Sequence, residues 1–547
     1  MDMIFAPIRF AIIAILLVLP IGACAAPLLP GASTNQSPVI ELGLNDYLQV
    51  VLQRNNALQA QVFQSEAARR KAKAEYGAFE PQLELSAMRE ANKRTNTVVQ
   101  QASQNGQGYF NERNNIYDSG IESLLPTGAK VRLGYTLSDL GNNVNPYGNI
   151  LSTTNQLWTR QYQTFFGASF TQPLLQNGGV AVTLAALRLA AADSEIGFQQ
   201  YRRQLMLTVA QAENAYWNLY FAQEQLRFFD DSVAVAQNVL DDSRQMLKAG
   251  QGTDLDVMEA QSGLALRETK RNEVLQDYYD ALSNLRSLEG DAPSAQLTGP
   301  EEPSIRVTDA PPATNAVITY ADGFADTVEM NPDFLIQKQK MKQEALRLGV
   351  AKNQLLPQLD FKAAYGYNGL GNTPGDSWNM VQDETFPSWS LGLQLTIPLG
   401  GNIKARNLSN AAKLSLQAAY TSLCGMQTEI ANHLSSAIRK TRAWQESIQN
   451  YQTVVHFNEE LLQTEFARLK AGTIEARKVL EVEADLLDAR QNLASALVKS
   501  QQSELQVELA SGSLLKNHHL EVTREELKME SAGLSRRNQA ASDAVSN

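Results

Sequence analysis

The chain has 547 residues, of which 44% are hydrophobic and 19% are charged, and its formal net charge is −11. Basic residues form no block longer than three, which excludes a typical nucleic-acid surface because phosphate binding needs clustered Lys and Arg. The four His and two Cys are a poor supply of soft ligands, which argues against a zinc or haem site and against a disulfide framework.

Residues 1–24 have the pattern of an export signal, followed by a linker at 25–40. Arg9 precedes an apolar run from Phe10 to Pro20, and Ile21-Gly22-Ala23-Cys24 comes next. This last stretch also resembles a lipoprotein signal box, in which Cys24 would be acylated. The alternative is ordinary cleavage one or two residues later. The apolar run is too short for a convincing membrane helix and nothing after residue 30 resembles one, so a membrane role requires a β-barrel.

The remaining chain consists of two similar halves, a first repeat at 41–290 and a second at 316–515, joined by a Pro-rich linker at 291–315. In each half an Asn lies 26 residues before a Pro-Gln-Leu segment, Asn55 before Pro81 and Asn331 before Pro357. The later matches are Phe170–Leu174 with Leu395–Leu399, Gly178-Gly179 with Gly400-Gly401, Leu247–Gly250 with Leu469–Gly472, and Val257–Glu259 with Val479–Glu481.

Both halves contain a segment that predicts a very long helix, at 180–248 and at 402–470. Each segment has no Pro and a single Gly, and good helix formers dominate both. At a rise of ~1.5 Å per residue, each helix would be roughly 100 Å long. Apolar residues recur at spacings of three and four, which indicates bundled helices. Gly250 and Gly472 are expected to end these helices, and returning helices are predicted at 254–288 and 475–514.

Four other segments alternate strictly between apolar and polar residues and predict β-strands, at 82–87, 166–171, 361–367 and 391–397. A strand with lipid on one side and water on the other has this pattern, although a strand of a soluble sandwich has it too. Four strands cannot close a membrane barrel, which needs about eight. The chain is therefore expected to share a barrel with copies of itself under cyclic symmetry.

These features together resemble the TolC-type outer-membrane efflux protein family, over roughly residues 42–515. The resemblance implies an α+β membrane protein of two tandem repeats, assembled as a homotrimer. A shared twelve-stranded barrel would lie in outer-membrane lipid, with a periplasmic α-helical barrel of long coiled helices below it. The implied function is an exit duct for efflux or type I secretion, working with a periplasmic adaptor (membrane fusion) protein and an inner-membrane RND or ABC transporter.

The first half departs from the simplest pattern of this family. It has 92 residues between Pro81 and Pro173, whereas the second half has 41 between Pro357 and Pro398. The additional residues include a turn signal at 124–128 and an alternating segment after it, which predict an extra hairpin. This hairpin either projects outside the cell or adds two strands per subunit. The polar tail at 516–547 is expected to be disordered.

The resemblance also implies two kinds of site. The turns Lys248-Ala249-Gly250 and Lys470-Ala471-Gly472 correspond to the tips that dock on the adaptor. The pore constriction corresponds to Asp256, Glu259, Lys478 and Glu481, where acidic rings in a trimer would attract cations. Lys478 stands where the family often has an acidic residue, and it is expected to pair with Asp256 of a neighbouring helix.

The sequence contains no recognisable nucleophile elbow or phosphate loop, so no catalytic residue, metal ligand or cofactor is predicted and the chain is not expected to be an enzyme. His433 and His456 are 23 residues apart, which is not a metal-ligand spacing, and His518-His519 lies in the tail. The alternative to an exit duct is a trimeric coiled-coil structural or surface protein of the outer membrane that does not conduct. The predicted strands and turn tips favour the duct.

Overall fold

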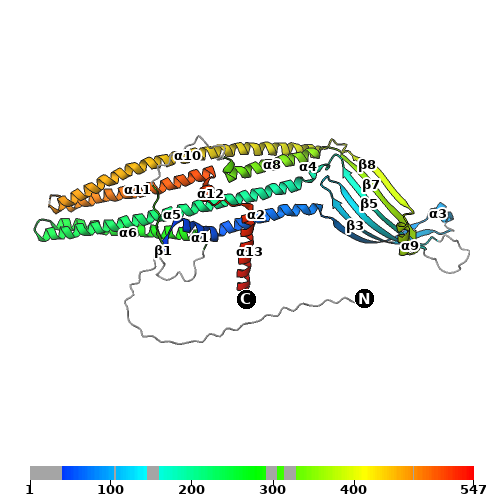
Figure 1. Cartoon of the computed structure of the whole chain (residues 1–547), viewed down its shortest axis with the longest axis horizontal. Helices are drawn as coiled ribbons and strands as arrows, with labels where there is room; N and C mark the ends of the chain where they lie inside the picture. Colours follow the sequence, from blue (N-terminus) through cyan, green and yellow to red (C-terminus); the bar gives the residue numbers. More distant parts are fainter. Residues whose placement is uncertain are drawn as a thin grey trace, which may run out of the picture.

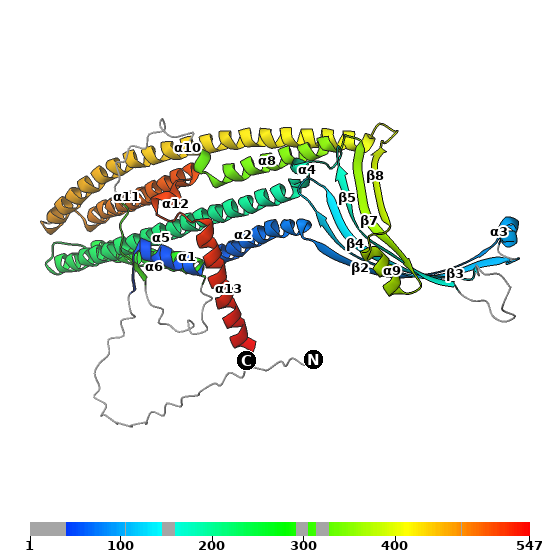
Figure 2. The same ribbon diagram turned by 45° about the vertical axis from the view of Figure 1, so that its right-hand side comes forward.

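The computed structural model describes residues 40–103, 106–144, 159–290, 305–312, 328–471 and 473–546. The molecule is elongated, with long helices at one end and a sheet at the other (Figure 1), and a turned view shows the same division (Figure 2). The residues predicted to form an export signal, Cys24, Gly472 and most of the linker at 291–315 lie outside the described residues.

Two rods dominate the helical end, α5 (Ala185–Lys248, 64 residues) and α10 (Ile403–Lys470, 68 residues). Each is followed by a returning helix that packs along it, α6 (Asp254–Leu288) and α11 (Ala476–Ser511). The two predicted pairs of long helices are thus confirmed. The shorter helices α2 (Asn56–Ala74) and α8 (Pro332–Asn353) also pack on the rods, so that α8 lies between α5 and α10.

Each of these shorter helices begins at an asparagine, and the two asparagines make equivalent hydrogen bonds. The side chain of Asn55 accepts from Leu58 N–H (3.0 Å) and donates to Leu288 O at the end of α6 (3.1 Å). Asn331 accepts from the N–H groups of Asp333 and Phe334 and donates to Ala510 O near the end of α11 (3.2 Å). Both amides therefore cap one helix and satisfy a terminal carbonyl of another.

A six-stranded sheet forms the other end of the molecule, in the order β2-β3-β4-β5-β7-β8, and every neighbouring pair is antiparallel. All four predicted strand segments lie in it. The strands are β2 (Gln82–Thr95), β3 (Tyr109–Leu124), β4 (Lys130–Asn142), β5 (Thr159–Pro173), β7 (Gln358–Gly371) and β8 (Pro387–Thr396).

Of the two options for the extra hairpin, the structure shows the second: the hairpin joins the sheet and brings the four predicted strands to six. Its strands β3 and β4 pair with β2 and β5 as well as with each other. Gly128 closes the turn between them with a φ of 88°, a conformation that favours glycine. Gly179 N–H donates to Thr127 O (3.1 Å) just before α4 (Val180–Thr183), so this turn lies at the helical end of the sheet.

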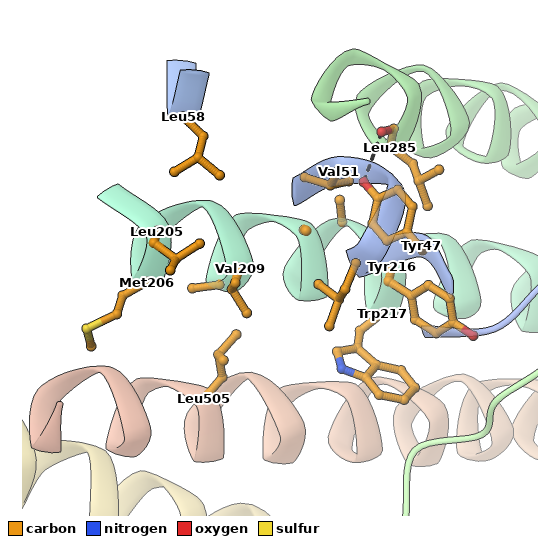
Figure 3. Packing of buried hydrophobic residues seen from close by; sticks show 14 of the residues in the cluster. Tyr47, Val51, Leu58, Leu205, Met206, Val209, Tyr216, Trp217, Leu285 and Leu505 are labelled. Carbon is orange, nitrogen blue, oxygen red and sulfur yellow. Dashed lines mark hydrogen bonds between the residues drawn. The ribbon is translucent and has the colours of Figure 1, made fainter. Parts of the chain in front are cut away.

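The main hydrophobic core lies midway along the helices, where α5 is surrounded by segments from both ends of the chain (Figure 3). Tyr47 of α1 (Leu44–Arg54) is fully buried, and its hydroxyl donates to Leu285 O of α6 (2.9 Å). Its ring stacks on Tyr216 of α5 at 6.2 Å between centroids. The short strands β1 (Ile40–Leu42) and β6 (Ile305–Val307) pair in parallel beside this core.

The prediction of a disordered tail is wrong. The chain continues through α12 (Leu514–Asn517) into a 23-residue helix, α13 (Arg524–Ser546), which packs on α2. Leu527 and Leu534 of α13 are buried in the main core, at 6% and 7% exposure. The other short helices in the described part of the chain are η1 (Glu75–Phe79), α3 (Val98–Ser103) and α9 (Pro374–Gln382).

Among the described residues, none of the helices combines the length and the apolar character that crossing a membrane requires.

Candidate functional site

The first long helix ends in a tight turn that glycine closes. Lys248 is the last residue of α5, Ala249 is its C-cap, and Gly250 follows with a φ of 74°. Gln251 N–H donates to Met246 O (2.9 Å), five residues back, which is the long hydrogen bond of a Schellman motif. The three predicted tip residues therefore form the end of the rod itself.

The second rod ends in the same way as far as the structure describes it. Lys470 is the last residue of α10 and Ala471 is its C-cap, while Gly472 lies outside the described residues. Thr473 N–H donates to Arg468 O (3.0 Å), again five residues back. This shared hydrogen bond makes the two tips alike in geometry although their sequences differ after the glycine.

The two tips lie together. A pocket of about 460 Å³ is lined by residues from both turns, including Asp256 of α6 and Lys478 of α11. The carboxylate of Asp256 accepts from Thr253 N–H (2.8 Å) and from the Thr253 hydroxyl (2.7 Å). This capping box fixes the first turn of α6, so Asp256 has a structural role in the turn.

The other predicted constriction residues lie close by. Glu481 is exposed, and its carboxylate lies 3.2 Å from Arg477 Nε and 3.4 Å from Lys478 Nζ on the same helix. Val479 and Leu480, which precede it, are buried at 0% and 8% exposure, as expected. Glu259 is half-buried one turn after Asp256. Where these side chains lie relative to a pore axis stays a prediction.

Sequence reasoning missed a buried ion pair just beyond the tips. Arg267 of α6 and Glu483 of α11 have exposures of 8% and 4%, and Arg267 Nε lies 2.8 Å from Glu483 Oε2. The guanidinium also donates to Leu480 O (2.9 Å) and to Ser232 Oγ of α5 (3.1 Å). The sequence held one signal for this pair. Arg267 lies seven residues, about two helical turns, from both Ala260 and Val274, so it shares a face of α6 with these buried apolar residues.

A second missed cluster joins the tail to the rods. His518 Nε2, just after α12, lies 3.0 Å from Glu213 Oε1 of α5 and 3.7 Å from Glu508 Oε2 of α11. The pKa of Glu213 is raised to about 7, mainly by burial; His518 lowers it and the neighbouring Glu508 raises it. The hydrogen bond with Glu508 raises the pKa of His518 in turn. No motif in the sequence indicates this cluster.

A sheet that continues into two pairs of long helices with tight tips is the architecture that the sequence predicted. The family profile described as "Outer membrane efflux protein" matches residues 130–291 and 326–513. The chain belongs to the outer membrane efflux protein family.

Individual relatives agree with this assignment. The chain is 25% identical to the outer membrane protein TolC of Vibrio cholerae over 369 residues, which cover 65% of this chain and 78% of that protein. It is 24% identical to the proteases secretion protein PrtF of Dickeya chrysanthemi over 372 residues, covering 66% and 76%. The solved Campylobacter jejuni CmeC outer membrane channel has the same fold, with a TM-score of 0.59 and 15% identity over 89% of each chain.

The chain is therefore an outer-membrane exit duct for efflux or secretion, located in the outer membrane with a large periplasmic portion. Its family is one of channel proteins rather than enzymes.

Proposed function

We propose that three copies of the chain form one duct, in which their sheets close a shared barrel and their helices a periplasmic tunnel. The observation that carries this proposal is the position of β2 and β8, which are the two end strands of the sheet. An unpaired strand edge in lipid is too costly to persist. Because β2 runs away from the helices and β8 runs back toward them, β8 of one copy can pair antiparallel with β2 of the next.

Three copies of a six-stranded sheet give eighteen strands, in place of the twelve that the family resemblance implied. An even number keeps every neighbouring pair antiparallel around the closed barrel. A barrel of eighteen strands is in the size range that leaves an aqueous channel. The extra hairpin thus supports a wider opening through the outer membrane.

The residues on the two faces of the sheet differ in polarity, which supports a barrel with one face toward lipid and the other toward water. One row of directly opposed residues crosses all six strands on a single face and is apolar throughout: Leu83, Ile121, Leu133, Ala168, Tyr365 and Trp389. Leu83 and Trp389 are 68% and 70% exposed in the single chain, as expected of side chains that contact lipid or a neighbouring copy. The adjacent row on the other face is Glu84, Gly120, Gly134, Gly167, Gly366 and Ser388.

The rods support the periplasmic part of the proposal. Helices of 64 and 68 residues are roughly 100 Å long, so the tips lie far from the sheet. The tips would dock on a periplasmic adaptor that connects the duct to an inner-membrane RND or ABC transporter. Acylation of Cys24 would add a lipid anchor to the same membrane.

Cysteine cross-linking between the end strands tests the assembly. One cysteine replaces Leu83, Leu85 or Ala87 on β2 and another replaces Trp389, Leu391 or Leu393 on β8, in a Cys424→Ser background because Cys424 is exposed. Oxidation should join neighbouring copies and give dimers and trimers in denaturing gels for the pairs in register. Single-cysteine variants on α6 are the controls. If no pair across β2 and β8 cross-links in outer-membrane preparations, the shared barrel is excluded.

A further inference from the structure

The C-terminal helix α13 has one half packed on the protein and one half free. Its start is fixed by a capping box, in which the Glu526 carboxylate accepts from Thr523 N–H (2.7 Å) and the Thr523 hydroxyl (2.9 Å). Leu527 and Leu534 are buried, and Glu530 Oε2 accepts from the Tyr201 hydroxyl of α5 (3.4 Å). From Ser535 to Ala540, by contrast, every side chain is exposed.

The packed half of α13 lies over an edge of the chain. It contacts α2, the helix that leads through η1 into the end strand β2. Figure 1 and Figure 2 both show α13 crossing α2 and projecting beyond it, away from α5. The opposite edge of the chain is formed by the end strand β8 and by α10, which follows it.

We infer that α13 is a clasp between subunits, whose free half lies on α10 of the neighbouring copy. This inference rests on the proposed assembly, in which β8 of one copy pairs with β2 of the next. That pairing brings the neighbour's α10 beside α2, on the side toward which α13 projects. From Leu534 to Ser546 the helix extends about 18 Å, more than the ~10 Å diameter of one helix.

Side-by-side contacts between helices of one chain show at which level along the tunnel axis α13 would meet the neighbouring α10. Tyr201 contacts α13, and Arg203, two residues further along α5, pairs with Asp333 of α8 (2.9 Å). The next residue of α8, Phe334, clusters with Ile430 of α10. Cyclic symmetry leaves heights along the tunnel axis unchanged. The part of the neighbouring α10 that α13 meets is therefore the part around Ile430.

The charges at this height are complementary. Arg536 and Arg537 are exposed on the free half of α13. Glu429 lies on α10 next to Ile430, and its side chain is 61% exposed. Its carboxylate lies 3.7 Å from Nε2 of His433, one turn further along the same helix. An exposed free thiol, Cys424, lies about one and a half turns away on the same helix.

A photoreactive phenylalanine analogue at Asn538 tests the clasp in the full-length protein in outer-membrane preparations. Illumination should give covalent dimers and trimers, and peptide mapping should place the cross-link within residues 411–439 of α10. Cross-links confined to one chain, or made to another protein, would overturn the inference. The β2 to β8 disulfides form the internal reference: if they form and Asn538 gives no cross-link between copies, the clasp fails while the assembly stands. If neither forms, the assembly itself fails.

A truncation after Leu534 tests the same contact without a probe. It keeps the packed half with Leu527 and Leu534, so the chain should still fold and form the β2 to β8 disulfides. The oligomer should dissociate at a lower temperature in detergent than the full-length protein does, and the charge reversal Arg536→Glu with Arg537→Glu should lower that temperature too. An unchanged dissociation temperature in both variants would contradict the clasp.

Discussion

Arg267 and Glu483 form a buried ion pair between the two returning helices, so that a residue from the first half of the chain neutralises one from the second. The pair lies about three turns from the tips, beside the small apolar cluster that contains Ala260, Val479 and Leu480. A charge buried this deeply is stable only with its partner. The two helical hairpins are therefore joined near their tips.

Arg267→Met is expected to loosen this end of the molecule, because it leaves the Glu483 carboxylate buried without a partner. Removing one member of a buried pair costs about 3–5 kcal/mol. Hydrogen exchange of residues 257–270 and 476–489 should speed up, whereas the sheet should stay protected. The double variant Arg267→Met with Glu483→Leu should restore most of the protection.

Arg271→Met is the matched control, since Arg271 forms a half-exposed pair with Asp230 four residues further along α6. Such surface pairs contribute about 1 kcal/mol or less. Equal effects of the Arg267 and Arg271 variants would show that burial of the first pair has no energetic role.

Docking of the tail is expected to weaken as pH rises through about 7. Glu213 has an ordinary pKa of 4.5 and a folded pKa of about 7, and the pKa of His518 is also raised. Partial burial also raises the pKa of Glu504 on α11, and the nearby Glu508 adds to this effect. Groups with raised folded pKa values bind protons more tightly in the docked state, so docking is favoured at low pH and lost as they deprotonate.

Hydrogen exchange of residues 514–523, corrected for the intrinsic pH dependence, should therefore show lower protection at pH 8 than at pH 6. Glu213→Gln should flatten this dependence, because glutamine does not titrate and needs no charged partner. A variant with the wild-type pH dependence would show that other groups control the docking.

The long helices and their ends could be predicted from sequence because each depends on local chemistry. Absence of Pro, good helix formers and a glycine directly after the C-cap decide the length and the end of α5 without reference to the rest of the chain. The alternation of the strands likewise depends on which face each residue occupies. Even the hairpin was visible at 124–128, although its place in the sheet depends on pairing with β2 and β5.

The tail and the buried charges could not be predicted in this way because tertiary contacts stabilise them. Between Arg524 and Ser535, α13 has only Leu527, Met529 and Leu534 as large apolar residues, and two of them are buried by α2, α5 and their neighbours. Arg267 and Glu483 lie 216 residues apart in the sequence, and they do not occupy equivalent positions in the two halves. A polar residue on an apolar face was the one available signal.

The topology of the hairpin predicts which side of the membrane its turn occupies. The Leu125–Ala129 turn lies at the helical end of the sheet, whereas α3 lies at the other end (Figure 2). In a Cys424→Ser background, Val99→Cys on α3 should react with an impermeant maleimide in intact cells. Pro126→Cys should react only after the outer membrane is permeabilised. Labelling of Pro126→Cys in intact cells would instead indicate a hairpin that projects outside.

A bulky side chain at Gly250, in the first tip, should block export without unfolding the chain. A Cβ atom at Gly250 would meet no atom within 4 Å, so a large side chain there projects outward. Its positive φ makes any L-residue strained by about 1–2 kcal/mol, and Gly250→Ala measures that strain alone. We expect Gly250→Trp to abolish export while Gly250→Ala retains most of it, with both proteins present in the outer membrane. Full export by Gly250→Trp would exclude this turn as a docking site.

The acidic residues beyond the tips should control ion passage if they surround the pore. Glu481 is exposed and pairs with both Arg477 and Lys478, so removing its charge leaves two positive charges at this level of each copy. Glu481→Gln should therefore lower the cation-to-anion permeability ratio in planar bilayers. We expect a two- to five-fold decrease, corresponding to roughly 0.5–1 kcal/mol between a carboxylate and a passing cation. Block by multivalent cations should weaken as well.

Asp256 provides the contrasting variant, because its carboxylate also caps α6 through Thr253. Asn retains an oxygen that accepts the same hydrogen bonds, so Asp256→Asn preserves the helix start and removes only the charge. If Lys478 of a neighbouring helix pairs with Asp256 in the closed duct, this variant should raise the open probability with little change in selectivity. Asp485→Asn, on an exposed position one turn beyond Glu481, controls for surface charge in general. Wild-type selectivity in Glu481→Gln together with wild-type opening in Asp256→Asn would place the constriction elsewhere in the tunnel.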